Sequence, residues 1–85
     1  MRIHVLDRIT AQHPEISRAD VLAAFHSVLV DVQRADGTWM AVGLDGRGRN
    51  LEMLYSVKNL DVVIYHAFTP PTKKFIREIS ERGKR

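Results

Sequence analysis

The sequence has no cysteine among its 85 residues. This excludes a disulfide framework and a thiolate metal site, and it suits a reducing cytoplasm. No apolar run approaches the length needed to cross a bilayer, and the opening "MRIHVLDRIT" carries charges where a secretory signal would be apolar. We therefore expect a cytoplasmic protein with no role in a membrane.

Several catalytic motifs are also missing. The sequence contains no H-E-x-x-H pair, and His4, His13 and His26 are scattered, so we expect no metal and no cofactor. It also lacks a G-x-S-x-G nucleophile elbow, a Walker loop and a dinucleotide fingerprint. These absences remove the commonest signals of zinc, serine and nucleotide-binding enzymes.

The composition is that of an ordinary globular domain, with 45% hydrophobic and 27% charged residues. We expect one domain covering residues 1–85, because so short a chain leaves little room for a second. Its charge is unevenly distributed. Residues 1–65 hold seven Lys/Arg and eight Asp/Glu, a sum of −1, whereas residues 66–85 hold six Lys/Arg and two Glu, a sum of +4. A polyanion such as RNA would be attracted most strongly to the C-terminal end, although basic tails also serve solubility.

The first third of the chain predicts two helices. Apolar residues at helical spacing predict a first helix that Pro14 ends, and Ser17 with Asp20 forms a capping-box pattern that starts a second. We expect that helix to give way to a strand near Val28, because "VLVDV" is β-branched and alternates. The apolar stripe of the first helix is Ile3, Leu6 and Ile9 with His13, and that of the second is Val21, Leu22, Phe25, Val28 and Leu29.

Three turn signals, "ADGT", "LDGRGRN" and "VKNLD", separate four extended runs. Short connections join antiparallel neighbours, so the pattern predicts a four-stranded antiparallel meander. Thr69 is the expected cap of a final helix, with Pro70 and Pro71 in its first turn and Gly83 at its end. The predicted fold is α+β: two N-terminal helices, the meander, and a C-terminal helix packed through Phe75, Ile76 and Ile79.

The last extended run, "VVIYHAF", ends near a histidine. Strict alternation would place Val62, Ile64, His66 and Phe68 on one face. Both faces are apolar, which predicts a strand inside the sheet. His66 is a candidate general acid–base because histidine titrates near neutral pH, or it is a histidine hydrogen-bonded at the edge of the core. We expect it near Lys73 or Arg77.

Two groups of basic residues are candidate phosphate ligands. Lys73, Lys74 and Arg77 can share one flank of the last helix, or they can form a solvated face in which Lys74 pairs with Glu78 and Arg77 with Glu81. Arg47 and Arg49 extend from a glycine-containing turn and are either RNA contacts or loop charges. The aromatic residues Trp39, Tyr55 and Tyr65 fall on predicted strands and are expected in the core.

The segments "WMAVGLDGRGRNLEMLYSV" and "VVIYHAFTPPTKKFIRE" together resemble the BrnT-like toxins of bacterial type II toxin–antitoxin systems, within the RelE-like group of ribonucleases. The resemblance covers roughly residues 17 to 80. It implies metal-independent RNA cleavage, with basic residues holding the phosphate, and an antitoxin that neutralises the toxin. A dimer and a toxin–antitoxin heterotetramer are both compatible with it.

We expect catalytic roles for His66, Lys73 and Arg77, and RNA binding by Arg47, Arg49, Lys73, Lys74 and Arg77. Of these, Lys73, Lys74 and Arg77 keep the basic character that the family has in its last helix. His66 stands where the family usually has serine, and Phe68 where it usually has a site arginine. Three hypotheses stay open: a toxin-type ribonuclease, a non-catalytic module that binds nucleic acid or protein, and a structural subunit that pairs with another copy.

Overall fold

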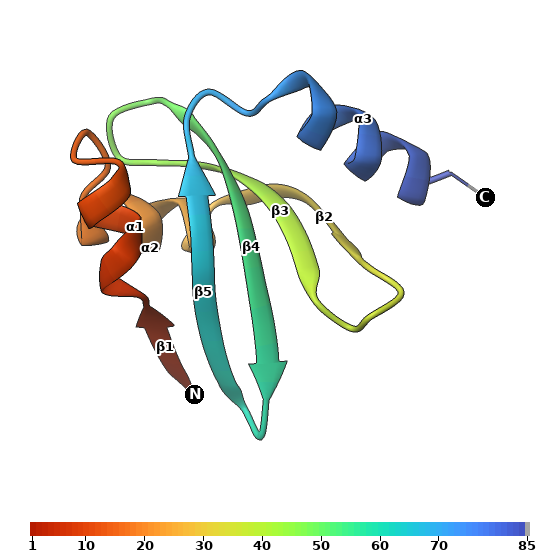
Figure 1. Ribbon diagram of the computed structural model, residues 1–85, viewed down its shortest axis with the longest axis horizontal. Helices are drawn as coiled ribbons and strands as arrows, with labels where there is room; N and C mark the ends of the chain where they lie inside the picture. Colours follow the sequence, from red (N-terminus) through yellow and green to blue (C-terminus); the bar gives the residue numbers. More distant parts are fainter. Residues whose placement is uncertain (85) are drawn as a thin grey trace.

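In the computed structural model, which describes residues 1–84, three helices pack on a five-stranded sheet (Figure 1). The predicted α+β class is confirmed. The elements in chain order are β1 (Arg2–Val5), α1 (Asp7–Gln12), α2 (Arg18–His26), β2 (Val28–Gln33), β3 (Trp39–Leu44), β4 (Asn50–Lys58), β5 (Asp61–Phe68) and α3 (Lys73–Arg82).

The sheet has the strand order β1-β5-β4-β3-β2. The three predicted turns do join antiparallel neighbours, from β2 to β5. The prediction of a four-stranded antiparallel sheet is nevertheless wrong, because β1 adds a fifth strand that runs parallel to β5. The β4–β5 turn places both Asn59 and Leu60 at positive φ, the conformation of a tight two-residue hairpin turn.

The prediction of a helix at the start of the chain is wrong. Residues 2–5 form a strand rather than the first turns of a helix, and α1 begins only at Asp7. Ile3 and Val5 are partly buried while Arg2 and His4 are exposed, so this segment alternates with a period of two. The helical spacing of Ile3, Leu6 and Ile9 was therefore a misleading coincidence.

β1 also explains why β5 is apolar on both faces. As the last strand of a four-stranded meander, β5 would lie at an edge, yet its sequence predicts an interior strand. In the structure β5 pairs with β4 on one side and with β1 on the other. The predicted interior position is confirmed, and β1 supplies the neighbour that this position requires.

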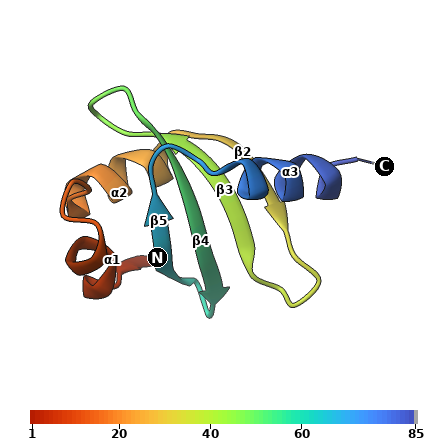
Figure 2. The ribbon, with the colours of Figure 1, turned by 45° about the horizontal axis from the view of Figure 1, so that its top comes forward.

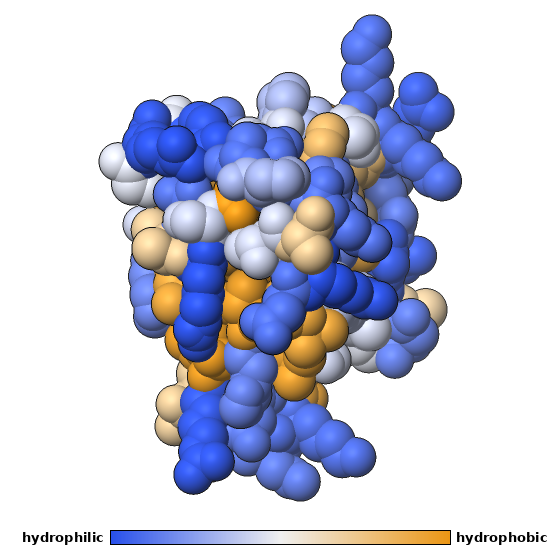
Figure 3. Space-filling model, turned by 60° about the vertical axis from the view of Figure 1, so that its left-hand side comes forward, coloured by the Kyte–Doolittle hydropathy of each residue, from blue (hydrophilic) through white to orange (hydrophobic). Residues whose placement is uncertain are grey.

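The helices cover opposite faces of the sheet (Figures 1 and 2). α1 and α2 contribute to the larger core. From the left-hand side of Figure 1, the upper half of the surface is largely hydrophilic and hydrophobic residues are visible below it (Figure 3). α3 covers a smaller core on the other face through Phe75 and Ile79, which pack with Met40 and Val42. Ile76, predicted to pack there too, is 44% exposed.

α2 begins as the sequence predicts. The Ser17 hydroxyl accepts from the Asp20 amide, and the Asp20 carboxylate accepts from the Ser17 amide, so the capping box is confirmed. The helix ends before Val28, and Leu29, which the helical stripe placed in the core, is 66% exposed on β2. At Gly43 a Cβ would lie 2.0 Å from the Ala24 carbonyl oxygen, so the contact of α2 with β3 requires glycine there.

A β-bulge breaks the alternation of β5. The pairing runs from Tyr55–Ile64 to Leu54–His66, which leaves Tyr65 as the extra residue. The Tyr65 carbonyl is satisfied by the Arg8 guanidinium at 3.2 and 3.3 Å. His66 is therefore shifted off the face of Ile64, and the predicted placement of both on one face is wrong.

The last helix begins later than predicted. Its cap is Thr72, whose hydroxyl accepts from the Phe75 amide, so Pro70 and Pro71 precede the helix rather than forming its first turn. Thr69 instead donates its hydroxyl to the Asn50 carbonyl at 2.7 Å. The helix does end at Gly83, as predicted.

Candidate functional site

Three charged residues are buried among residues 1–84, and they organise the polar parts of the molecule. Asp20 and Asp45 belong to a network that joins α2 to the β3–β4 loop, and Glu52 lies on β4 beneath the start of α3. Burying a carboxylate costs free energy unless it is hydrogen-bonded, so the partners of these three residues identify the polar contacts that the fold depends on.

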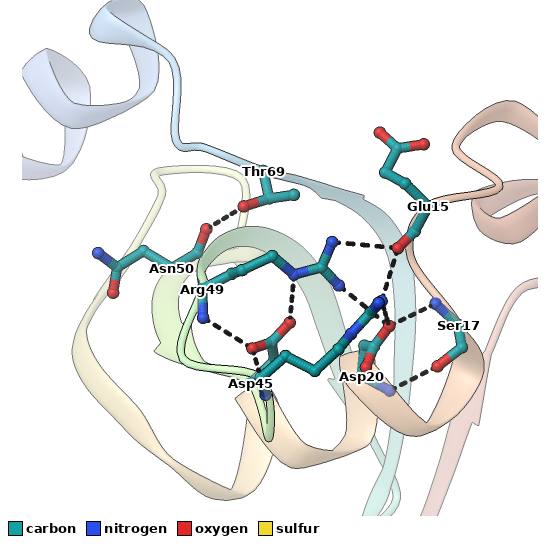
Figure 4. A network of polar contacts seen from close by, with 8 residues as sticks. Glu15, Ser17, Asp20, Asp45, Arg49, Asn50 and Thr69 are labelled. Carbon is teal, nitrogen blue, oxygen red and sulfur yellow. Dashed lines mark hydrogen bonds and ion pairs between the residues drawn. The ribbon is translucent and has the colours of Figure 1, made fainter.

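The loop network is centred on Asp45, whose side chain is fully buried (Figure 4). Its carboxylate accepts from the backbone amides of Arg47 and Arg49 at 2.9 and 2.8 Å, and from the Arg49 Nε at 2.8 Å. Burial acts to raise the pKa of Asp45, but these hydrogen bonds outweigh it and the pKa lies below its usual range.

The Asp20 carboxylate forms ion pairs with both arginines of the loop. The Arg47 guanidinium donates to its Oδ2, and Arg49 does so at 3.1 Å, while both also donate to the Glu15 carbonyl. Burial acts to raise the pKa of Asp20, but the hydrogen bonds from Arg47 and Ser17 lower it to about 2. The loop is thus attached to the start of α2 by ion pairs.

The ion pairs of this network involve Arg47 and Arg49, which the sequence predicts as candidate RNA contacts. Two guanidinium groups face two carboxylates, those of Asp20 and Asp45, so the local charges cancel. A phosphate would meet less positive charge here than the sequence indicates. The contacts explain both arginines as structural residues that hold the loop.

His66 is paired with a carboxylate. Its Nε2 lies 2.8 Å from Oε2 of Glu52, and the imidazole is 36% exposed whereas the Glu52 side chain is 6% exposed. Burial acts to raise the pKa of Glu52, but hydrogen bonds from His66 and Thr72 offset this and the pKa lies below its usual range. The pair therefore consists of a buried carboxylate and an imidazole that is accessible to solvent.

The same carboxylate holds the start of α3. The Thr72 amide and hydroxyl both donate to Oε1 of Glu52, at 2.7 and 3.1 Å. His66 is thereby linked through one side chain to the residue that caps α3. The expectation that His66 lies near the opening of the helix is met through Glu52, and its hydrogen-bonding partner is this carboxylate rather than Lys73 or Arg77.

Glu52 and Thr72 were not identified from the sequence. Glu52 carries one available signal, a charged residue inside the apolar strand "LEMLY", but its partner is 14 residues away along the chain. The antiparallel pairing of β4 with β5 brings Glu52 and His66 close together. The bulge at Tyr65 pairs His66 with Leu54, and this places His66 on the face of the sheet that carries Leu54 and Glu52.

The basic residues of α3 lie on its exposed surface. Lys73, Lys74 and Arg77 are exposed, and no ion pair or side-chain hydrogen bond joins them to another described residue. The alternative pairing of Lys74 with Glu78 is not formed. Oε2 of Glu78 instead pairs with the Nε atoms of Arg34 and Arg82, at 2.9 and 2.8 Å. We define Lys73, Lys74 and Arg77 as the basic flank of α3.

Two of the three aromatic residues expected in the core, Trp39 and Tyr55, pack together there. Tyr55 is buried, and Trp39 stacks on it with ring centroids 6.3 Å apart, which confirms a core position for this pair. Within residues 1–84, no group of three His, Asp or Glu side chains is placed to hold a metal ion. None of the helices over this range is long and apolar enough to cross a membrane.

Comparison with known proteins finds no matching family model, no matching curated protein and no matching solved structure.

Proposed function

We propose that this protein is a small cytoplasmic ribonuclease of the toxin type, which cleaves RNA without a metal and is neutralised by a partner antitoxin. The observation that carries the proposal is the Glu52–His66 pair at the start of α3. It combines a solvent-accessible imidazole, a buried carboxylate at 2.8 Å, and a helix whose basic flank has no acidic partner among residues 1–84. Together these supply the two functions that RNA cleavage needs, proton transfer and phosphate binding.

The chemistry is an internal displacement at phosphorus. The ribose 2′-oxygen attacks the adjacent phosphorus, the bond from phosphorus to the 5′-oxygen breaks, and a 2′,3′-cyclic phosphate forms. The proton of the 2′-hydroxyl passes to His66, and the departing 5′-oxygen takes a proton from water. Lys73, Lys74 and Arg77 bind the phosphate and stabilise its growing negative charge.

The proposed antitoxin would have to cover this region to neutralise the protein. An unpaired basic flank favours a partner that presents acidic side chains, because complementary charge speeds encounter and excludes wrong partners. Co-expression with the product of a neighbouring reading frame, followed by co-purification, would identify that partner.

The test is cleavage of RNA by purified protein in the presence of a chelator, comparing the parent with His66→Ala. Loss of a general acid–base typically lowers the rate by about 10²–10⁴-fold. His26→Ala is the matched control, because His26 is exposed at the end of α2 and makes no contact with Glu52. Equal cleavage by the parent and His66→Ala would remove His66 from the mechanism.

A non-catalytic nucleic-acid-binding module is the second candidate. It is favoured by the exposed basic flank, since basic side chains at a surface bind a polyanion by neutralising its phosphates. Phe68, at the position of the family's site arginine, also favours it. Binding of RNA by the parent with no cleavage under any condition would select this candidate.

A further inference from the structure

Glu52 is placed to decide which nitrogen of His66 carries the proton. A carboxylate can only accept hydrogen bonds, and the contacts of Glu52 keep it ionised at neutral pH. Because Oε2 of Glu52 lies 2.8 Å from Nε2 of His66, that nitrogen must donate. A neutral imidazole that donates from Nε2 has its lone pair on Nδ1.

The other oxygen of Glu52 is held equally firmly. The backbone amide of Thr72 can only donate, and the Thr72 hydroxyl also donates to Oε1 while its oxygen accepts from the Phe75 amide. Both oxygens of the carboxylate are thus occupied, one by α3 and one by the imidazole. With its side chain 6% exposed, Glu52 is shielded from water that would compete for these bonds.

We propose that Glu52 is a positioning residue, which fixes His66 as the Nε2–H tautomer so that Nδ1 is the atom that exchanges a proton with substrate. This inference rests on the proposed ribonuclease function for its catalytic consequence, but the tautomer itself can be measured without any substrate. The link from Thr72 through Glu52 to His66 also sets the orientation of the ring relative to the first turn of α3, where the basic flank begins.

The geometry makes a specific prediction for Glu52→Gln, which preserves shape but replaces one acceptor by a donor. The Thr72 amide still requires an acceptor, so the glutamine carbonyl stays toward Thr72 and its NH₂ faces His66. Nε2 must then accept, and the proton moves to Nδ1. The variant is expected to have the opposite tautomer with little change in packing.

The experiment is long-range ¹H–¹⁵N correlation spectroscopy of His66 at alkaline pH, where the ring is neutral. The parent should show a protonated Nε2, and Glu52→Gln a protonated Nδ1. Glu78→Gln is the matched control, since Glu78 lies further along α3 and contacts Arg34 and Arg82 instead of His66. In this variant His66 should have the same tautomer as in the parent. In RNA cleavage, Glu52→Gln should lower kcat by about 10²-fold or more, with KM nearly unchanged.

The outcomes separate the two proposals. A parent ring protonated on Nδ1 would overturn the positioning role even if Glu52→Gln failed to fold. The expected tautomers with full cleavage by Glu52→Gln would also overturn it, because the orientation of the ring would then be irrelevant to the reaction. The expected tautomers with no cleavage by the parent would uphold the orientation of His66 by Glu52 and refute the ribonuclease function instead.

Discussion

The β3–β4 loop and α3 are both rich in basic residues, but they use their charges in opposite ways. In the loop, Arg47 and Arg49 face the carboxylates of Asp20 and Asp45 and attach the loop to α2. On α3, the basic flank makes no such contact within residues 1–84, and the helix is attached by the apolar Phe75 and Ile79 and by the ion pair of Glu78 with Arg34.

The difference shows that a basic residue is available to a ligand only where the fold does not already use its charge. In the loop both arginines pair with carboxylates, whereas on α3 the ion pairs involve Glu78 and Arg82 and leave the basic flank in solvent. The two regions should therefore respond in opposite ways to substitution: the loop through stability, and the basic flank through binding.

The largest expected effect on stability comes from Phe75→Ala, which removes the main apolar anchor of α3. Phe75 is 6% exposed, and truncating a buried phenylalanine costs about 3–5 kcal/mol. Unfolding in denaturant would measure the change. Ile76→Ala is the control on the same helix, because Ile76 is 44% exposed and its loss should cost less than about 1 kcal/mol. Similar losses in the two variants would show that α3 is not anchored as described.

A smaller loss is expected when the ion pairs of the loop are weakened by Asp45→Asn. Asparagine keeps an oxygen for the two backbone amides but loses the charge that pairs with Arg49, which should cost about 2 kcal/mol. Asp31→Asn is the control, because Asp31 is exposed on β2 and its substitution should change stability by less than about 0.5 kcal/mol. An unchanged midpoint for Asp45→Asn would contradict the structural role of the loop network.

The loop network should also make stability depend on acid pH. The pKa of Asp20 is about 2 in the folded protein against an ordinary value of 3.8, so the folded state favours the ionised carboxylate. Its stabilisation is fully present above about pH 4 and is lost as the pH falls toward 2. We expect a contribution of about 1 kcal/mol, because the partner Arg47 is 58% exposed and water screens the pair. Asp20→Asn should flatten this part of the stability–pH curve, and an unaltered slope would count against the pairing.

Much of the fold was accessible from local patterns. The capping box at Ser17, the turns of the meander and the apolar anchors Phe75 and Ile79 each depend on neighbouring residues, and each was predicted. The strand at residues 2–5 was not, because its partner β5 lies about 60 positions further along the chain and a four-residue alternation is a weak local signal. The cap of α3 was misplaced for the same kind of reason, since Glu52 on β4 holds Thr72.

The candidate site was only partly accessible. His66 and the basic flank were singled out from residue type and spacing, but the partners of His66, Arg47 and Arg49 depend on tertiary contacts. The bulge at Tyr65 rotates His66 toward Glu52, and the folding of the loop onto α2 brings Arg47 and Arg49 to Asp20. Neither event leaves a pattern in the local sequence.

The most direct test of the proposed binding surface is the salt dependence of RNA binding by the triple variant Lys73→Gln, Lys74→Gln, Arg77→Gln. Each lost phosphate contact should reduce the slope of log affinity against log salt by about one unit, while stability stays within about 0.5 kcal/mol of the parent. The charge-matched control is Arg2→Gln, Arg18→Gln, Lys58→Gln, at exposed positions away from α3. We expect a reduced slope for the first variant and a parent-like slope for the second. Equal slopes for the two variants would contradict the claim that the basic flank of α3 is the RNA-binding surface.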